Sequence, residues 1–173
     1  MKKRYNIALI PIQNQHAFIK MAEALSSTIT PATYMLSANS FPHVSVCHFA
    51  TESEQIDTVW KKVKNLSLSP LTLSFTTRRG QTYPNNEVAW VSLIPNHIDN
   101  LMDIHLKIAA IIKHPLNAAF ADYDPHLTLF NSLEKTSCEW LNHHSEIHPP
   151  LTEEFVIALG ESDDVGQFTK ILF

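Results

Sequence analysis

The sequence predicts an α+β fold built from antiparallel sheets, and three observations lead to this prediction. Segments of alternating apolar and polar residues, typical of strands, lie between segments with the i, i+3, i+4, i+7 apolar spacing of amphipathic helices. Several predicted strands follow one another directly, which favours antiparallel pairing over a doubly wound parallel sheet. A short motif containing His43 recurs around His126, which indicates an internal duplication.

The first half of the chain is predicted to contain three strands and two helices. Strands are expected at 6–12, 43–49 and 70–76. The apolar stripe of the first helix consists of Phe18, Met21, Ala22 and Leu25. Thr51 and Glu54 have the spacing of a capping box at the start of the second helix. The segment 78–86 contains glycine, proline and asparagine, and is therefore predicted to be rich in turns.

The second half has a similar order of elements. Strands are expected at 87–94, 125–131, 153–160 and 167–173. The apolar face of the long helix consists of Ile98, Leu101, Met102, Ile108, Ala109 and Ile112. Asn96 is expected to cap this helix, and 136–139 reads as a second capping box before a short helix. Because no linker divides the chain, we predict a single domain spanning 1–173.

Composition excludes one class of function. The chain has 173 residues, 45% hydrophobic residues and a formal net charge of −4, with a pI near 6.2. A protein that holds long nucleic acid needs a dense field of lysine and arginine. A small phosphorylated ligand or the end of an RNA remains compatible with this charge. We therefore expect a small nucleotide, a cyclic phosphate or an RNA end as the partner, and no long nucleic acid.

The N-terminus and the cysteines indicate a cytoplasmic protein. The basic start is followed by an apolar run, Ile7–Ile10, that Pro11 interrupts. This run is too short for an export signal or a membrane span, so we expect no membrane partner. Cys47 and Cys138 have no metal-ligand spacing and form no disulfide framework, so we expect reduced thiols.

The repeated motif reads Pro-His-aliphatic-hydroxyl-aliphatic. Its two copies are Pro42-His43-Val44-Ser45-Val46 and Pro125-His126-Leu127-Thr128-Leu129. Both copies fall in predicted strands, where side chains alternate between faces with period two. Each histidine therefore shares a face with its hydroxyl residue. If the two halves pack about a pseudo-twofold axis, two imidazoles and two hydroxyls meet across one cleft.

This set of side chains suits phosphodiester cleavage. An ordinary imidazole titrates near about 6.5, so His43 and His126 can serve as a general acid and a general base at neutral pH. Ser45 and Thr128 can donate hydrogen bonds to phosphate oxygens. Such chemistry requires no metal, and we predict no cofactor.

At these residues the sequence resembles the two-histidine phosphoesterases, which include bacterial 2′-5′ RNA ligase-like proteins and plant and yeast cyclic phosphodiesterases. Their signature is a pair of His-x-Ser/Thr motifs, here His43-Val44-Ser45 and His126-Leu127-Thr128. The resemblance implies a bilobal fold of two pseudo-twofold-related lobes, with antiparallel sheets flanked by helices and a central cleft. It implies a phosphoric diester hydrolase that opens 2′,3′-cyclic phosphates without a metal. His43 and His126 would be catalytic, and Ser45 and Thr128 would bind phosphate.

Further residues are candidates for substrate binding. Phe130 follows Thr128 at i+2, so it is expected to face the cleft, where it could stack on a base. Tyr123 precedes the second motif, and Arg79 and Tyr83 lie in the turn-rich segment that could reach over the cleft. By strand parity, His48 is expected to point away from the cleft.

Three alternatives remain open. An RNA 2′-5′ ligase or an RNA end-processing enzyme would use the same motifs. A nucleotide-binding module would keep the fold without turnover. In a metal-binding or structural protein, the histidines would have a role other than catalysis. His143, His144 and His148 are the candidates for a metal site, although Pro149 and Pro150 follow at once and no acidic partner has the required spacing.

Overall fold

A computed structural model describes residues 2–83, 86–96, 98–112, 115–116 and 123–173. The first half of the chain contains β1 (Lys3–Pro11), α1 (Gln15–Ser26), β2 (Val44–Thr51), a short 3-10 helix (Ser53–Gln55), α2 (Ile56–Lys64) and β3 (Leu71–Thr82). The second half contains β4 (Ala89–Pro95), α3 (Ile98–Ile111), β5 (Leu127–Ser132), α4 (Lys135–Leu141), β6 (Glu146–Ser162) and β7 (Phe168–Ile171). Apart from the 3-10 helix and the additional strand β7, each half therefore has the order strand, helix, strand, helix, strand, as a duplication predicts.

The seven strands form one sheet in which every strand pairing is antiparallel. The order is β1-β2-β5-β4-β3-β6-β7, and β1 also pairs with β6. Six strands therefore close into a ring, and β7 lies outside it. The strand β6 pairs with β3 through its first part and with β1 through its second, and the change occurs at Phe155. The predicted α+β class with antiparallel pairing is confirmed.

The two halves exchange strands reciprocally. The first strand of each half pairs with the second strand of its own half and with the third strand of the other: β1 with β2 and β6, and β4 with β5 and β3. The second strands meet where Val44 pairs with Leu127. Because these two residues each follow a motif histidine, the pseudo-twofold axis passes between the motifs. The predicted pseudo-twofold relation of the halves is thus confirmed.

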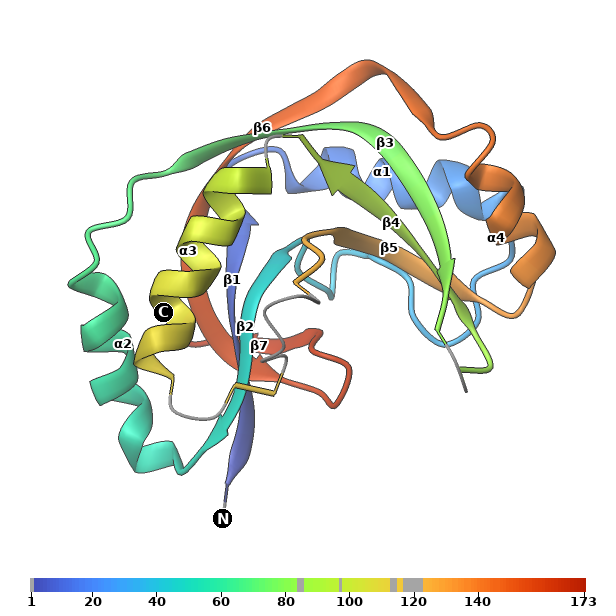
Figure 1. The fold of residues 1–173 in the computed structure, drawn as a ribbon. Helices are drawn as coiled ribbons and strands as arrows, with labels where there is room; N and C mark the ends of the chain where they lie inside the picture. The colour runs from blue at the N-terminus through green and yellow to red at the C-terminus, as the bar shows by residue number, and fades with distance from the viewer. Residues whose placement is uncertain (1, 84–85, 97, 113–114, 117–122) are drawn as a thin grey trace.

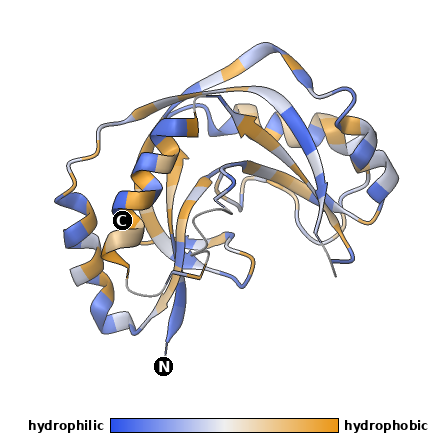
Figure 2. Ribbon diagram, viewed as in Figure 1, coloured by the Kyte–Doolittle hydropathy of each residue, from blue (hydrophilic) through white to orange (hydrophobic). Residues whose placement is uncertain are grey.

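Helices flank both halves of the arched sheet (Figure 1). The helix α3 packs on β2 and α2 packs on α3, whereas α1 packs on β5 and α4 on β3 and β4. Phe18 of α1 makes edge-on ring contacts with Phe75 of β3 and Phe155 of β6, at centroid distances of 5.6 and 5.9 Å. The strand β4 is largely hydrophobic, whereas the helices alternate hydrophilic and hydrophobic residues (Figure 2). The core therefore lies between the sheet and the apolar faces of its helices.

Several predicted boundaries are wrong. The strand β3 continues to Thr82, because residues 77–82 pair with β4 instead of forming a turn. Residues 84–85 of the predicted turn lie outside the described residues. The strand β6 begins at Glu146, earlier than predicted, because its first residues pair with β3.

Both predicted capping boxes are wrong as well. Thr51 pairs with Lys3 in the sheet, so it cannot cap the helix, and its hydroxyl instead donates to Gln55 Oε1. Thr136 lies inside α4, which begins at Lys135. None of the described helices is long and apolar enough to cross a membrane.

Candidate active site

The two motifs face a common cleft of about 530 Å³. It is lined by His43, Ser45, His48, Gln81, Tyr83, Tyr123, Asp124, His126, Thr128, Val165 and Gln167. His43 and His126 immediately precede β2 and β5, and these strands supply Ser45, His48 and Thr128. The end of β3 supplies Gln81, and the turn between β6 and β7 supplies Val165 and Gln167. All four motif side chains predicted to converge are therefore in one place.

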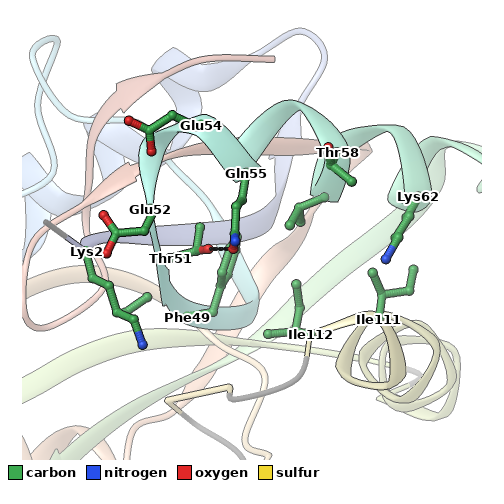
Figure 3. A pocket seen from close by; sticks show the side chains of 12 residues that line it. Lys2, Phe49, Thr51, Glu52, Glu54, Gln55, Thr58, Lys62, Ile111 and Ile112 are labelled. Atoms are coloured by element: carbon green, nitrogen blue, oxygen red, sulfur yellow. Dashed lines mark hydrogen bonds between the residues drawn. The ribbon is translucent and has the colours of Figure 1, made fainter.

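A second depression of about 570 Å³ lies elsewhere, between β2, α2 and the end of α3 (Figure 3). Apolar side chains such as Phe49 and Ile112 line it together with charged ones such as Lys62 and Glu54. Neither motif histidine lines this depression. It is therefore separate from the candidate active site.

Each motif histidine is oriented by a hydrogen bond of the same kind, from Nδ1 to the backbone carbonyl two residues earlier. Nδ1 of His43 lies 2.7 Å from the carbonyl oxygen of Phe41, and Nδ1 of His126 lies 2.7 Å from that of Asp124. A carbonyl oxygen only accepts hydrogen bonds, so each Nδ1 carries a proton and donates it. The atom that gains or loses a proton is therefore Nε2 in both rings.

Burial makes both imidazoles favour their neutral form. His43 is only 6% exposed, and desolvation lowers its pKa; the nearby His126 lowers it further. Desolvation also lowers the pKa of His126, although the neighbouring Asp124 carboxylate opposes this. Either Nε2 can therefore accept a proton at neutral pH, and a ring that has been protonated gives its Nε2 proton up readily.

Arg79 lies beside this site but does not line the cleft. Both of its terminal nitrogens bond the two carboxylate oxygens of Asp124, whose Oδ2 is 3.9 Å from Nδ1 of His126. The guanidinium of Arg79, a sequence candidate for substrate binding, is therefore engaged by a carboxylate beside the cleft. Its contact fixes the residue whose carbonyl orients His126.

The two hydroxyl residues differ in their surroundings. Ser45 Oγ accepts a hydrogen bond from Nδ2 of Asn6 at 2.9 Å and lies 3.1 Å from Nε2 of His48. Thr128 is 8% exposed and makes no side-chain hydrogen bond to another described residue. Ser45 is thus held in place, whereas the Thr128 hydroxyl can turn toward a ligand.

Phe130 does not face the cleft. It is fully buried in the hydrophobic core, so the prediction that it stacks on a base is wrong. The register of β5 against β4 shifts after Thr128, so that Leu129 is an extra residue in a β-bulge. The bulge breaks the alternation of side chains on which the prediction relied.

An equivalent bulge in β2 reverses the prediction for His48. The register of β2 against β1 shifts between Ser45 and Cys47, so Val46 is the extra residue. His48 therefore lines the cleft instead of pointing away from it, and Cys47 lies in the core. Burial raises the pKa of the Cys47 thiol to about 12, as suits an unreactive core residue.

Tyr123 and Tyr83 both line the cleft, as expected of substrate-binding candidates. The Tyr123 hydroxyl donates to the carbonyl oxygen of Ser45 at 3.1 Å, and its ring stacks on His105 at 4.1 Å. Tyr83 is 39% exposed and also lines an adjoining recess of about 270 Å³ with Trp90. Tyr123 thus braces the first motif, whereas Tyr83 is available to a ligand.

Sequence reasoning missed several lining residues. Gln81, Val165, Gln167 and Trp90 belong to strands and turns that carry no motif. The turn between β6 and β7 reaches the cleft only because β6 pairs with β1 beside β2. A pairing between such distant segments leaves no local signal in the sequence.

The histidines considered for a metal site lie elsewhere. His144 stacks on Trp140, with ring centroids 4.0 Å apart, and His148 pairs with Glu146 at the surface. Within the described ranges, no cluster of three histidine, cysteine, aspartate or glutamate side chains is arranged to hold a metal ion. His143 lies after the end of α4 and is exposed.

Solved structures with the same fold are known, although no protein-family model and no curated protein matches the sequence. E. coli LigT complexed with 3′-AMP is 14% identical, with a TM-score of 0.63, and the match covers 99% of this chain and 95% of LigT. E. coli LigT complexed with phosphate is 11% identical, with a TM-score of 0.62 and the same coverage. A phosphoesterase is 12% identical, with a TM-score of 0.55, over 99% of this chain and 96% of its own. Over nearly its whole length, the chain therefore has the fold of E. coli LigT.

Proposed function

We propose that this chain is a phosphoric diester hydrolase that opens 2′,3′-cyclic nucleotides or cyclic phosphate ends to a phosphomonoester. The observation that carries the proposal is the matched pair of histidines in one cleft, each presenting Nε2 as its exchangeable site. A binding module needs one ring at most, whereas hydrolysis uses a base and an acid together.

The reaction follows from this geometry. The phosphorus lies between the two rings, with its oxygens held by the hydroxyls of Ser45 and Thr128. One Nε2 takes a proton from water as the water oxygen bonds to phosphorus. The other Nε2 gives a proton to the ribose oxygen as its bond to phosphorus breaks. These four side chains supply acid, base and phosphate ligands, so we propose that the reaction is independent of metal.

Ligands of proteins with this fold support the proposed substrate class. E. coli LigT forms complexes with 3′-AMP, phosphate, ATP and NADP+. The first of these is the monoester left when 2′,3′-cyclic AMP opens at its 2′ oxygen. The recess beside Tyr83 and Trp90 adjoins His126 and Thr128, and offers aromatic surface for a nucleobase.

The surface of the cleft favours a small substrate over a long RNA. Its described lining residues include one acidic side chain, Asp124, and no lysine or arginine. Arg79, which lies beside the cleft, already pairs with Asp124. The lining residues therefore favour hydrolysis of small cyclic phosphates over RNA ligation or RNA end processing.

The test is hydrolysis of a panel of 2′,3′-cyclic nucleotides in EDTA by the wild type, His43→Ala and His126→Ala. We expect wild-type turnover that survives the chelator and falls by at least about a hundredfold in each variant, as the loss of a general acid or base should cause. His148→Ala is the matched control, because this side chain is 76% exposed and lies outside the cleft. Turnover undiminished in both motif variants would overturn the proposal.

A further inference from the structure

Asn6 is a polar residue in an apolar strand. It is fully buried in β1 between Tyr5 and Ile7, which belong to the core. Its Oδ1 is buried without a hydrogen-bond partner among the described residues. A buried acceptor left unpaired destabilises the fold, so such a group calls for a physical explanation.

The side-chain amide of Asn6 has a fixed orientation. One of its terminal atoms lies 2.8 Å from the carbonyl oxygen of Gly166, which can only accept a hydrogen bond. That atom is therefore the amide nitrogen, Nδ2. The same nitrogen lies 2.9 Å from Ser45 Oγ, so Asn6 donates to this hydroxyl as well as to the β6–β7 turn.

His48 approaches the same hydroxyl from its own strand. Its Nε2 is 3.1 Å from Ser45 Oγ, and the bulge at Val46 is what turns the ring toward the cleft. The ring also needs Gly166, because a Cβ on that residue would overlap the imidazole. Asn6 and Gly166, which are buried, and His48, which is half-buried, thus form a support around Ser45.

We propose that Asn6 and His48 are positioning residues that both donate to Ser45 Oγ and so direct its hydroxyl hydrogen into the cleft, toward a substrate phosphate oxygen. A hydroxyl oxygen has two lone pairs and one hydrogen. When two donors occupy the lone pairs, the hydrogen must point to the remaining side, which is the cleft that Ser45 lines. This inference rests on the proposed function, in which Ser45 binds phosphate.

The proposal requires one particular tautomer of His48. With the proton on Nε2 the ring donates to Ser45. With the proton on Nδ1 the ring would accept the Ser45 hydrogen, and no donor would remain for phosphate. A two-bond ¹H–¹⁵N spectrum of the folded protein at neutral pH, assigned with His48→Gln, distinguishes the two tautomers. We expect the proton on Nε2, and finding it on Nδ1 would overturn the proposal.

A double-mutant cycle gives a second test with turnover as the readout. In Asn6→Asp the donor becomes an acceptor of the same shape, and we expect kcat/KM to fall at least about tenfold. In a Ser45→Ala background the same change should cost less than about twofold, because the hydroxyl on which it acts is gone. Equal losses in both backgrounds would overturn the proposal.

The chain offers a matched control in Asn131, another buried asparagine. Its side chain bonds only the loop at Thr33 and Tyr34 and does not line the cleft. We therefore expect Asn131→Asp to have the same effect in both backgrounds.

A pair of variants at His48 covers the case in which Asn6→Asp fails to fold. His48→Gln places an amide near the position of Nε2 and should keep kcat/KM within about threefold, whereas His48→Leu should lose at least about tenfold. Equal activity of these two variants would overturn the proposal. If the wild type opens no cyclic phosphate, the proposed function fails, and the tautomer of His48 still decides the positioning role on its own.

Discussion

His43 and His126 are equivalent in the sequence motif but not in their surroundings. The ring of His43 packs against Phe168, with centroids 4.9 Å apart, whereas His126 lies next to the Arg79–Asp124 pair. Phe168 comes from β7 and Arg79 from β3, so neither neighbour is visible from the motif itself. The motif was sufficient to predict the pair of rings, and the tertiary fold makes the two rings different.

The depressed pKa values predict the pH dependence of turnover. His43 is buried and His126 is half-buried, and desolvation lowers the pKa of each below the ordinary 6.5. The base works above its pKa and the acid works below its own, so activity peaks midway between the two values. We therefore expect the pH optimum of kcat/KM to fall below about 6.5. An optimum above about 7.5 would contradict the burial of these rings.

Replacing Asp124 should identify the role of His126. The Asp124 carboxylate raises the pKa of His126, and Arg79 lowers it. Asp124→Asn keeps the backbone carbonyl that orients the ring but removes the negative charge, so the pKa of His126 should fall further. We expect one limb of the kcat/KM profile to move to lower pH: the acidic limb if His126 is the base, the alkaline limb if it is the acid. Unchanged limbs would mean that this carboxylate does not influence catalysis.

Trp90 offers a test of nucleobase binding. It lines the recess next to His126 and contacts the ring of Tyr34. Base stacking on an aromatic ring contributes about 1–3 kcal/mol, so Trp90→Leu should raise KM about tenfold with little change in kcat. The effect should vanish for a cyclic phosphate that carries no base. A fall in kcat with an unchanged KM would indicate that the nucleobase binds away from Trp90.

At the scale of the elements, the alternation of side chains along a strand predicted the correct face as far as the hydroxyl residue of each motif. It predicted the wrong face for the residues that follow. It placed His43 with Ser45 and His126 with Thr128 correctly, but it misplaced Phe130 and His48. The bulges responsible are stabilised by hydrogen bonds from residues outside the two strands. Nδ1 of His105 in α3 bonds the carbonyl of Val46, and the backbone N–H of Leu36 bonds that of Leu129. A strand sequence alone cannot reveal such partners.

The turn between β6 and β7 should depend on Gly166. This residue has φ +90, and a Cβ there would overlap the ring of His48. We expect Gly166→Ala to lower the free energy of unfolding by about 2 kcal/mol or more, measured by urea denaturation, because backbone strain and overlap add. Val165→Ala is the control, since this neighbouring side chain is exposed and should change stability by less than about 0.5 kcal/mol. Equal stability of the two variants would contradict the packing of this turn.

At the scale of the whole molecule, the repeated motif correctly indicated two related halves. It could not indicate how they combine, because each half lends its third strand to the first strand of the other. These pairings join residues far apart in the sequence, such as Asn6 and Gly160. Local apolar patterns specify which segments become strands, and the choice of partners depends on packing across the whole chain.

The net charge of the molecule predicts the KM for longer substrates. With a net charge of −4 and no lysine or arginine among the described lining residues, the protein offers few contacts to additional phosphates. We expect a 20-nucleotide RNA with a 2′,3′-cyclic phosphate end to have a KM within about threefold of the mononucleotide, with little dependence on salt. A KM that rises steeply with salt would instead indicate an extended RNA-binding surface.

The most direct test of the division of labour between His43 and His126 uses a substrate that needs no acid. A 2′,3′-cyclic phosphate with sulfur in place of the leaving oxygen expels a thiolate, whose parent thiol has a pKa near about 8.5 and so leaves without protonation. Both sulfur isomers are compared with the oxygen substrate in His43→Ala and His126→Ala. We predict that one variant recovers most of its activity on one isomer and the other variant recovers none. Equal impairment of both variants on all three substrates would contradict a general acid and a general base at these two residues.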